Sequence, residues 1–165
     1  MKTFIILGMH RSATSLVAGG VQSMGVHIGE DLLGPAKGNP KGFYENRVFV
    51  RLNREILKAA GGMWSSPPSR EDILATRDQF DSRIRDTVDV SKKELWGFKD
   101  PRMVLTIELF LPYLERPHFI ACFRDPMEVA MSLKVRNGFE LERGLALANE
   151  YNKRLIDFLS RRYTV

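Results

Sequence analysis

Hydroxyl-bearing and cationic side chains are gathered in one short loop near the N-terminus, over residues 8–15. The loop begins at Gly8 after an apolar run, and it contains Arg11, Thr14 and Ser15. Backbone N–H groups in a loop of this kind, together with the N-terminus of the helix that follows, bind phosphate oxygens. The planar guanidinium of Arg11 adds paired donors that suit a phosphate or a sulfate. These residue types therefore predict an anion-binding loop.

This loop departs at two positions from the pattern G-x-x-x-x-G-K-[ST] of nucleoside triphosphatases. Ala13 stands where the second glycine belongs, and Thr14 stands where the lysine belongs. If the backbone at Ala13 needs a positive φ, the alanine costs roughly 1 kcal/mol of strain. An ordinary turn between a strand and a helix, with hydroxyl groups as caps, is the alternative interpretation.

A second cationic segment begins at Arg124, directly after another apolar run. Pro126 suits the first turn of a helix, and Ser132 lies two turns further along that helix. An arginine and a serine at this spacing suit a second phosphate group. Pairing of Arg124 with Asp125 or with another carboxylate is the structural alternative.

The elements that position these loops alternate between strand and helix, which predicts an α/β fold with a parallel sheet. The carboxyl ends of parallel strands lie at one edge of the sheet, so the loops after the strands should converge on one crevice. The apolar runs that predict buried strands cover 4–7, 95–98 and 118–123. The segments that predict helices cover about 16–24, 46–60, 69–90, 103–114, 126–136 and 140–160.

Two of these helices carry more detailed expectations. The helix over 46–60 should carry one apolar face, formed by Val48, Leu52, Ile56 and Leu57. Ser69 and Asp72 resemble a capping box, which predicts one polar helix from there to about residue 90. Its apolar stripe is thin, so this helix is expected to project from the body. A long glycine-rich and proline-rich loop is expected over 25–44.

Length and composition bound the class of protein. The 165 residues suffice for one domain with a buried core, and 44% hydrophobic with 27% charged residues is typical of a soluble globular protein. The net charge of +5 suits the binding of polyanionic small molecules. The sequence has no Lys/Arg tract with interleaved aromatic residues, so a nucleic-acid-binding groove is not expected. The first apolar run is too short for a signal peptide or a membrane span. The single cysteine, Cys122, cannot form an intramolecular disulfide. A cytoplasmic setting is therefore expected.

Together these segments resemble sulfotransferases that use 3′-phosphoadenosine-5′-phosphosulfate. Residues 8–16 resemble their 5′-phosphosulfate-binding loop, and residues 124–132 resemble their 3′-phosphate-binding motif with the same arginine-to-serine spacing. Residues 38–46 and 96–102 are similar to segments of a bacterial branch of that family. The resemblance spans about residues 4–140.

The resemblance implies a three-layer, P-loop-like α/β fold with a central parallel sheet flanked by helices. It implies 3′-phosphoadenosine-5′-phosphosulfate as sulfuryl donor, adenosine 3′,5′-bisphosphate as product and no metal. The residues that it places at the 5′-phosphosulfate are Arg11, Ser12, Thr14 and Ser15, with Ala13 in the same loop, and those at the 3′-phosphate are Arg124 and Ser132.

Sulfuryl transfer needs a base for the acceptor and cations for the leaving phosphate. Lys99, just past the second strand, is the candidate cation, with a solvated surface lysine as the alternative. Glu45 is the candidate base, with an acidic first-turn residue of the next helix as the alternative. His10 is the rival base, although contact with the donor or packing is favoured for it. Asp100 and Arg102 are expected to pair or to shape the crevice.

Several alternatives stay open at this point. The acceptor, a small molecule or a carbohydrate, should enter over 25–70, where Phe43, Tyr44 and Trp64 would stack on a ring or belong to the core. A nucleotide or small-molecule kinase and a non-catalytic nucleotide-binding relative are the rival functions. Members of the family usually continue past Val165, so the chain is interpreted as one domain over 1–165, with truncation, a short variant or an inactive remnant left open. The oligomeric state is also open.

Overall fold

The computed structural model describes residues 1–35 and 42–163, with three strands in one parallel sheet. The central strand is the most apolar one, because it is covered on both faces and paired on both edges. In the register of the sheet, Ile5 lies beside Phe98 on one side and Phe119 on the other. The α/β class and the parallel sheet predicted above are confirmed. The strands are β1 (Lys2–Gly8), β2 (Leu95–Lys99) and β3 (Pro117–Cys122), in the order β2-β1-β3.

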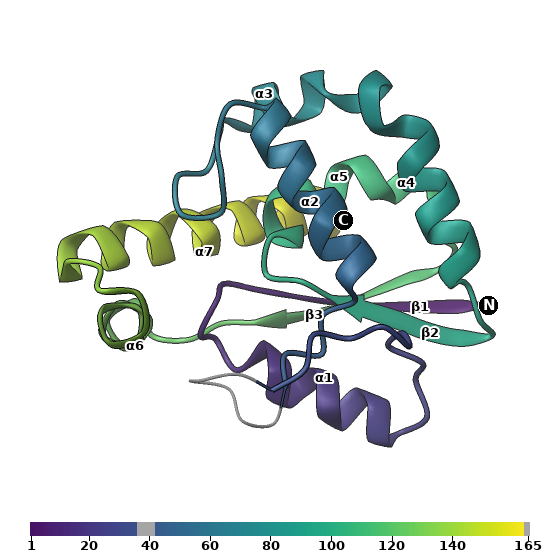
Figure 1. Ribbon diagram of the computed structural model, residues 1–165, viewed down its shortest axis with the longest axis horizontal. Helices are drawn as coiled ribbons and strands as arrows, with labels where there is room; N and C mark the ends of the chain where they lie inside the picture. The colour runs from purple at the N-terminus through teal and green to yellow at the C-terminus, as the bar shows by residue number, and fades with distance from the viewer. Residues whose placement is uncertain (36–41, 164–165) are drawn as a thin grey trace.

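Helices flank the sheet on both faces (Figure 1). The side chains of β1 alternate between these two faces. Ile6 points to a small cluster beneath α1, whereas Ile5 and Leu7 belong to a larger cluster with the remaining helices. No helix within the described residues is long and apolar enough to cross a membrane. The helices are α1 (Thr14–Ser23), α2 (Arg47–Ala59), α3 (Arg70–Ala75), α4 (Arg77–Ser91), α5 (Met103–Phe110), the 3-10 helix η1 (Leu111–Tyr113), α6 (Pro126–Asn137) and α7 (Leu141–Tyr163).

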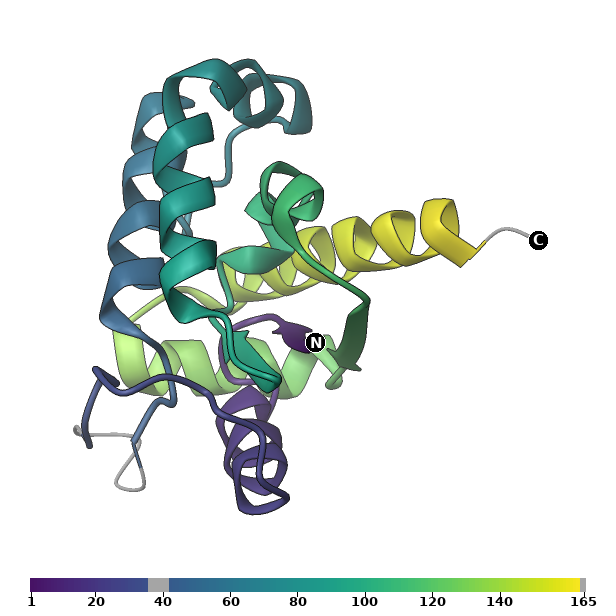
Figure 2. The ribbon, with the colours of Figure 1, turned by 90° about the vertical axis from the view of Figure 1, so that its right-hand side faces the viewer.

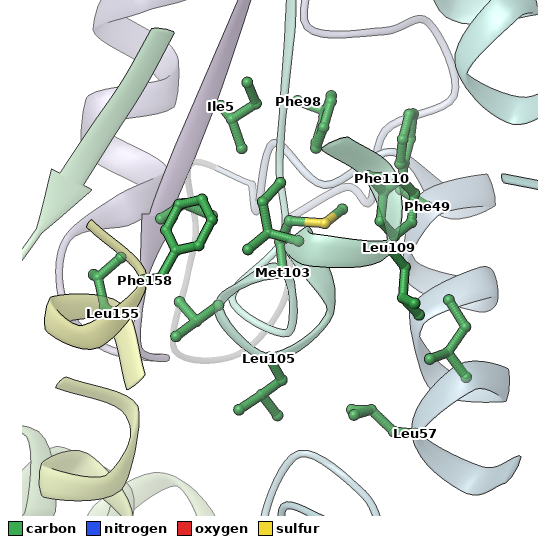
Figure 3. Packing of buried hydrophobic residues seen from close by; sticks show 14 of the residues in the cluster. Ile5, Phe49, Leu57, Phe98, Met103, Leu105, Leu109, Phe110, Leu155 and Phe158 are labelled. Atoms are coloured by element: carbon green, nitrogen blue, oxygen red, sulfur yellow. The ribbon is translucent and has the colours of Figure 1, made fainter. Parts of the chain in front are cut away.

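The larger cluster contains several aromatic rings, and Figure 3 labels Phe49, Phe98, Phe110 and Phe158 among its side chains. The rings of Phe49 from α2 and Phe98 from β2 lie 4.5 Å apart and nearly parallel, and Phe110 from α5 packs against both. Phe158 brings α7 onto the same face, where its ring meets Phe119 edge-on. Aromatic side chains bury large apolar areas, so this cluster fixes the helices against the sheet.

The segment over 69–90 differs from its prediction in two ways. Ser69 caps a helix as expected, since its Oγ accepts a hydrogen bond from the Asp72 N–H at 3.0 Å. That helix ends at Thr76, and α4 starts anew, so two helices replace one. The expected projection is wrong, because Phe80 and Ile84 are buried in the core and α4 lies beside α2 (Figure 2). The thin apolar stripe of α4 is therefore sufficient to pack this helix against α2 and α5.

The helix over 46–60 is confirmed, and its N-terminus explains its position. The Asn46 Oδ1 accepts from the Val48 N–H at 3.0 Å, which satisfies one of the free donors of the first turn. Leu52 and Ile56 are buried as expected, whereas Val48 is 37% exposed. Because Asn46 caps the start of α2, the preceding residue, Glu45, lies in the interior beside the ends of the strands.

Replacing Phe98 by alanine should lower the free energy of unfolding by about 3–5 kcal/mol, because the side chain is 1% exposed and leaves a cavity beside Phe49. Phe123→Ala is the matched control: that ring is 49% exposed, so its loss should cost about 1 kcal/mol or less. Urea denaturation of the two variants measures both values. Equal losses would contradict the described core.

Candidate functional site

The loops that follow the three strands meet at a pocket of about 260 Å³, named here the strand-end pocket. Figure 1 shows the three strands ending on the same side of the sheet, where α1 and α6 begin. The convergence predicted from the parallel strands is therefore confirmed. The strand-end pocket is lined by His10, Arg11, Ala13, Thr14, Ser15, Leu16, Phe43, Glu45, Lys99, Pro101, Arg124 and Arg136.

The loop between β1 and α1 presents the start of a helix to this pocket. Within the described residues no side-chain hydrogen bond caps α1, and the Leu16 N–H donates to the Ala13 carbonyl oxygen at 2.9 Å. The positive end of the helix faces the pocket beside Thr14 and Ser15. Ala13 adopts φ 59° and ψ 14°, the left-handed conformation that glycine would favour. Gly8 is required by close packing, since a Cβ there would lie 2.7 Å from the carbonyl oxygen of Cys122. The strain anticipated for an alanine in this loop is present.

Hydrogen bonds tie this loop to the segment after β3. The Arg11 Nε donates to the Ser132 Oγ at 2.7 Å, and the Arg124 Nη1 donates to the Arg11 carbonyl oxygen at 2.9 Å. Arg124 also pairs with Glu128 at 2.8 Å, whereas Asp125 caps α6. The two segments assigned to two different phosphates are thus joined, and their guanidiniums lie in one wall of the pocket.

Lys99 and Glu45 form a buried ion pair on the floor of the strand-end pocket. The Lys99 Nζ lies 2.7 Å from the Glu45 Oε1, and the residues are 2% and 4% exposed. The same ammonium donates to the Phe43 carbonyl oxygen at 2.9 Å and to the Ser15 Oγ at 3.2 Å. The alternative of a solvated lysine is therefore wrong. So is the alternative of Glu45 as a first-turn residue, because the helix begins after Asn46.

The protonation of Glu45 is governed by opposing effects. Burial raises the pKa of its carboxyl above the ordinary value, and the nearby Lys99 ammonium opposes that shift. Its second oxygen, Oε2, faces the Arg102 guanidinium at 3.6 Å. A carboxylate with a raised pKa is a stronger base than a solvated one, so this position suits proton removal at neutral pH.

A chain of buried polar groups continues below the ion pair. The Arg102 Nη1 binds the Asp100 Oδ1 at 2.7 Å, as the sequence suggested. The Asn53 amide donates to the other Asp100 oxygen at 2.9 Å, and Thr106 donates to the Asn53 carbonyl at 2.7 Å. These bonds orient the Arg102 guanidinium toward Glu45, although the buried Arg102 Nε has no hydrogen-bond partner among the described residues.

His10 packs rather than pairs. Its ring lies 4.4 Å from that of Trp64, and its Nε2 is buried without a hydrogen-bond partner among the described residues. Burial lowers the pKa of the imidazole well below its ordinary value, and Arg102 adds to the shift. The ring is therefore neutral at pH 7. Its packing against Trp64 agrees with one of the two roles favoured for it, and contact with the donor stays a prediction.

Arg136 is a site residue that the sequence reasoning missed. It lines the strand-end pocket from α6, four residues after Ser132 and therefore on the same helix face. Burial lowers the pKa of its guanidinium, and the positive charge of Arg11 adds to this effect. The spacing of Arg124, Ser132 and Arg136 was the signal that could have found it. Three guanidiniums, one ammonium and one carboxylate thus line the strand-end pocket.

Other predicted residues lie less directly on the pocket. Ser12 is 2% exposed, its Oγ lacks a hydrogen-bond partner among the described residues, and it does not line the cavity. Trp64 stacks on Phe139 at 5.8 Å and lies tilted against His10, and the Arg136 guanidinium lies 5.7 Å from its ring centre, so three protein side chains pack around it. Tyr44 packs toward Gly19. Residues 36–41, part of the long loop and of the segment 38–46, lie outside the described residues.

Replacing Ala13 by glycine should raise the free energy of unfolding by about 1 kcal/mol, because glycine adopts the left-handed conformation without steric cost. The control is Ala146→Gly, an exposed position inside α7, which should lower stability by about 1 kcal/mol. Thermal and urea unfolding report both changes. The same sign for both substitutions would show that the loop is not strained as described.

The strand-end pocket combines a helix start, several cations and a buried carboxylate. It can bind a multiply charged anion and can take a proton from a neighbouring hydroxyl or amine. Among the described residues no three His, Cys, Asp or Glu side chains are grouped as metal ligands. Comparison with protein-family models, with curated proteins and with solved structures finds no match to this chain. Its function is therefore inferred from the chemistry of this pocket.

Proposed function

We propose that this chain is a sulfotransferase that moves a sulfuryl group from 3′-phosphoadenosine-5′-phosphosulfate to a hydroxyl or amine. The observation that carries the proposal is that Arg11, Lys99 and Arg124 line one pocket together with the buried carboxylate of Glu45. These groups come from the three loops whose sequences resemble that family. We also propose that the parallel sheet and its helices form the three-layer, P-loop-like fold of such enzymes.

The donor fits the strand-end pocket by charge and by geometry. Its 5′-phosphosulfate would lie at the uncapped start of α1, near Thr14 and Ser15, where backbone N–H groups favour an anion. Its 3′-phosphate would lie toward Arg124, with Ser132 oriented by Arg11. Arg136 supplies a further charge from the same helix face. Planar guanidiniums bind such oxyanions in pairs of hydrogen bonds.

The proposed chemical step is an in-line displacement at sulfur. The acceptor oxygen or nitrogen forms a bond to sulfur, and the bond from sulfur to the bridging phosphate oxygen breaks. The acceptor proton passes to the Glu45 carboxylate, and adenosine 3′,5′-bisphosphate leaves with the electron pair. Lys99 lies beside both Glu45 and Ser15, so it would stabilise charge that develops on the leaving phosphate.

A kinase that uses a similar loop is the rival proposal, since Lys99 reaches the loop from β2 in place of the missing loop lysine. A kinase would also need carboxylates that hold Mg²⁺. Two buried carboxylates in or near the pocket already form ion pairs with basic side chains, Glu45 with Lys99 and Asp100 with Arg102. This pairing favours a donor whose negative charge is neutralised by arginine and lysine side chains over a donor that needs Mg²⁺.

Adenosine 3′,5′-bisphosphate should raise the midpoint of thermal unfolding. A ligand at 100 times its dissociation constant adds about 2.7 kcal/mol, which for a domain of this size corresponds to roughly 5–10 °C. AMP and ADP should give smaller shifts, because they lack the 3′-phosphate. Arg124→Gln should reduce the shift from the 3′-phosphorylated nucleotide to that of AMP, since it removes the guanidinium proposed to bind that phosphate.

Arg85→Gln is the matched control for this measurement. Arg85 also forms an ion pair with a carboxylate four residues away in sequence, but on α4 and outside the pocket. It should keep the full shift. A shift with ATP-Mg²⁺ alone would reject the sulfotransferase and favour the kinase. Binding of the 3′-phosphorylated nucleotide without transfer to any acceptor would favour a non-catalytic relative.

The rate of sulfuryl transfer should rise with pH as Glu45 loses its proton. Because burial raises the pKa of this carboxyl, the midpoint of the acid limb should lie above about 4.3, the ordinary value for glutamate. Glu45→Gln should lower kcat by about 10²–10⁴-fold and abolish that limb. Glu55→Gln, an exposed change on α2, should do neither. The pH–rate profiles of the two variants are measured by the release of adenosine 3′,5′-bisphosphate from the donor. An unchanged acid limb in the profile of Glu45→Gln would exclude Glu45 as the base.

A further inference from the structure

A second pocket of about 260 Å³ adjoins the strand-end pocket and shares part of its wall. We name it the arginine pocket, because Arg54, Arg102 and Arg136 all line it. Glu45 and Phe43 line both pockets, so the candidate base lies in the wall between them. A molecule in the arginine pocket would therefore reach the same carboxylate as a donor in the strand-end pocket.

The arginine pocket carries an excess of positive charge. Glu45 is matched by Lys99 and Arg102 is matched by Asp100, each at 2.7 Å. Within residues 1–35 and 42–162, neither Arg54 nor Arg136 has a carboxylate within ion-pair distance. Arg136 instead donates to the Asn137 side chain and lies 5.7 Å from the centre of the Trp64 ring. Among the described residues, two guanidiniums at one pocket thus have no ion-pair partner, and the Glu45 carboxylate acts on Arg136 only from beyond ion-pair distance.

Two buried polar atoms in this wall also lack hydrogen-bond partners. The Nε2 of His10, in a side chain that is only 8% exposed, and the Nε of Arg102 have none among the described residues. Both side chains line the arginine pocket. A buried polar atom without a hydrogen bond is unfavourable, so a bound water or ligand group that reached either atom would be stabilised. The remaining wall is apolar, with Leu33 and Phe43.

From this arrangement we propose that the arginine pocket binds the sulfuryl acceptor, and that the acceptor is a hydroxylated ring compound with a carboxylate. Its carboxylate pairs with Arg54 at the mouth of the pocket, the ring lies against Phe43, and the hydroxyl reaches Glu45. This inference rests on the proposed sulfotransferase function, and it adds the charge of the acceptor to that function. Trp64 acts as a wall, because His10, Phe139 and Arg136 already pack around its ring.

The test compares three ring compounds that differ in charge: 4-hydroxyphenylacetate, its neutral amide and tyramine. Calorimetric binding is measured with adenosine 3′,5′-bisphosphate present in excess, and sulfuryl transfer is measured separately with the donor. The carboxylate should bind about tenfold or more tightly than the amide, with tyramine weakest, because a desolvated charge pair favours the anion. Arg54→Gln should remove this preference.

Arg51→Gln is the matched control, since Arg51 lies one turn earlier on α2 and does not line the arginine pocket. It should keep the tenfold preference, which separates a local contact from a change in overall charge. Equal binding of the three compounds, or equal effects of the two variants, would overturn the inference. Transfer to the amide or tyramine at the carboxylate's rate would also overturn it, while leaving the sulfotransferase proposal intact. Binding that depends on Arg54, without any transfer, would support an acidic ligand and reject the sulfotransferase proposal instead.

Discussion

The ion pair between Lys99 and Glu45 is the interaction on which the geometry of the strand-end pocket depends. Removing either charge from water alone costs several kcal/mol, so each side chain is stable inside only while the other is in place. Lys99 also binds the backbone before α2 and the first turn of α1. One ammonium therefore sets the positions of three segments that are distant in sequence. The sheet supplies the rigid end from which it extends.

The polar interior around this pair explains how so many cations can gather at one place. Asp100 holds Arg102 through two hydrogen bonds, from the backbone and from the side chain, and Asn53 and Thr106 orient that carboxylate from α2 and α5. These contacts fix the floor of the pocket before any ligand arrives. The cations above the floor are then ready to meet an anion with little rearrangement, which is the condition for effective electrostatic stabilisation.

Much of the fold was predictable because local patterns determine it. The apolar runs gave the three strands, and proline, glycine and capping residues gave most helix ends. The break at Thr76 was missed, since nothing in the composition of 69–90 interrupts a helical pattern. The docking of α4 was missed because three buried side chains suffice against a neighbouring helix. Convergence of the loops followed from parallel topology alone.

The candidate site was predictable in its loops but less so in its contacts. The pairing of Lys99 with Glu45 spans 54 residues, and no local pattern distinguishes a buried lysine from a solvated one at a strand end. The positive φ of Ala13 was considered in advance because this residue replaces a glycine of the loop pattern, and glycine often adopts the left-handed conformation. The neutral His10 and the role of Arg136 depend on tertiary burial, although the spacing from Ser132 to Arg136 pointed to a common face.

Arg136 belongs to the walls of both pockets, and this has a thermodynamic consequence. Anions that occupy the two pockets together must share one guanidinium as counter-charge. Each bound anion then weakens the affinity for the other by the same factor, because such coupling is reciprocal. Under the proposed function, an excess of an acidic acceptor would compete with the nucleotide without entering its pocket. Departure of the product nucleotide would in turn be hastened by the arrival of the next acceptor.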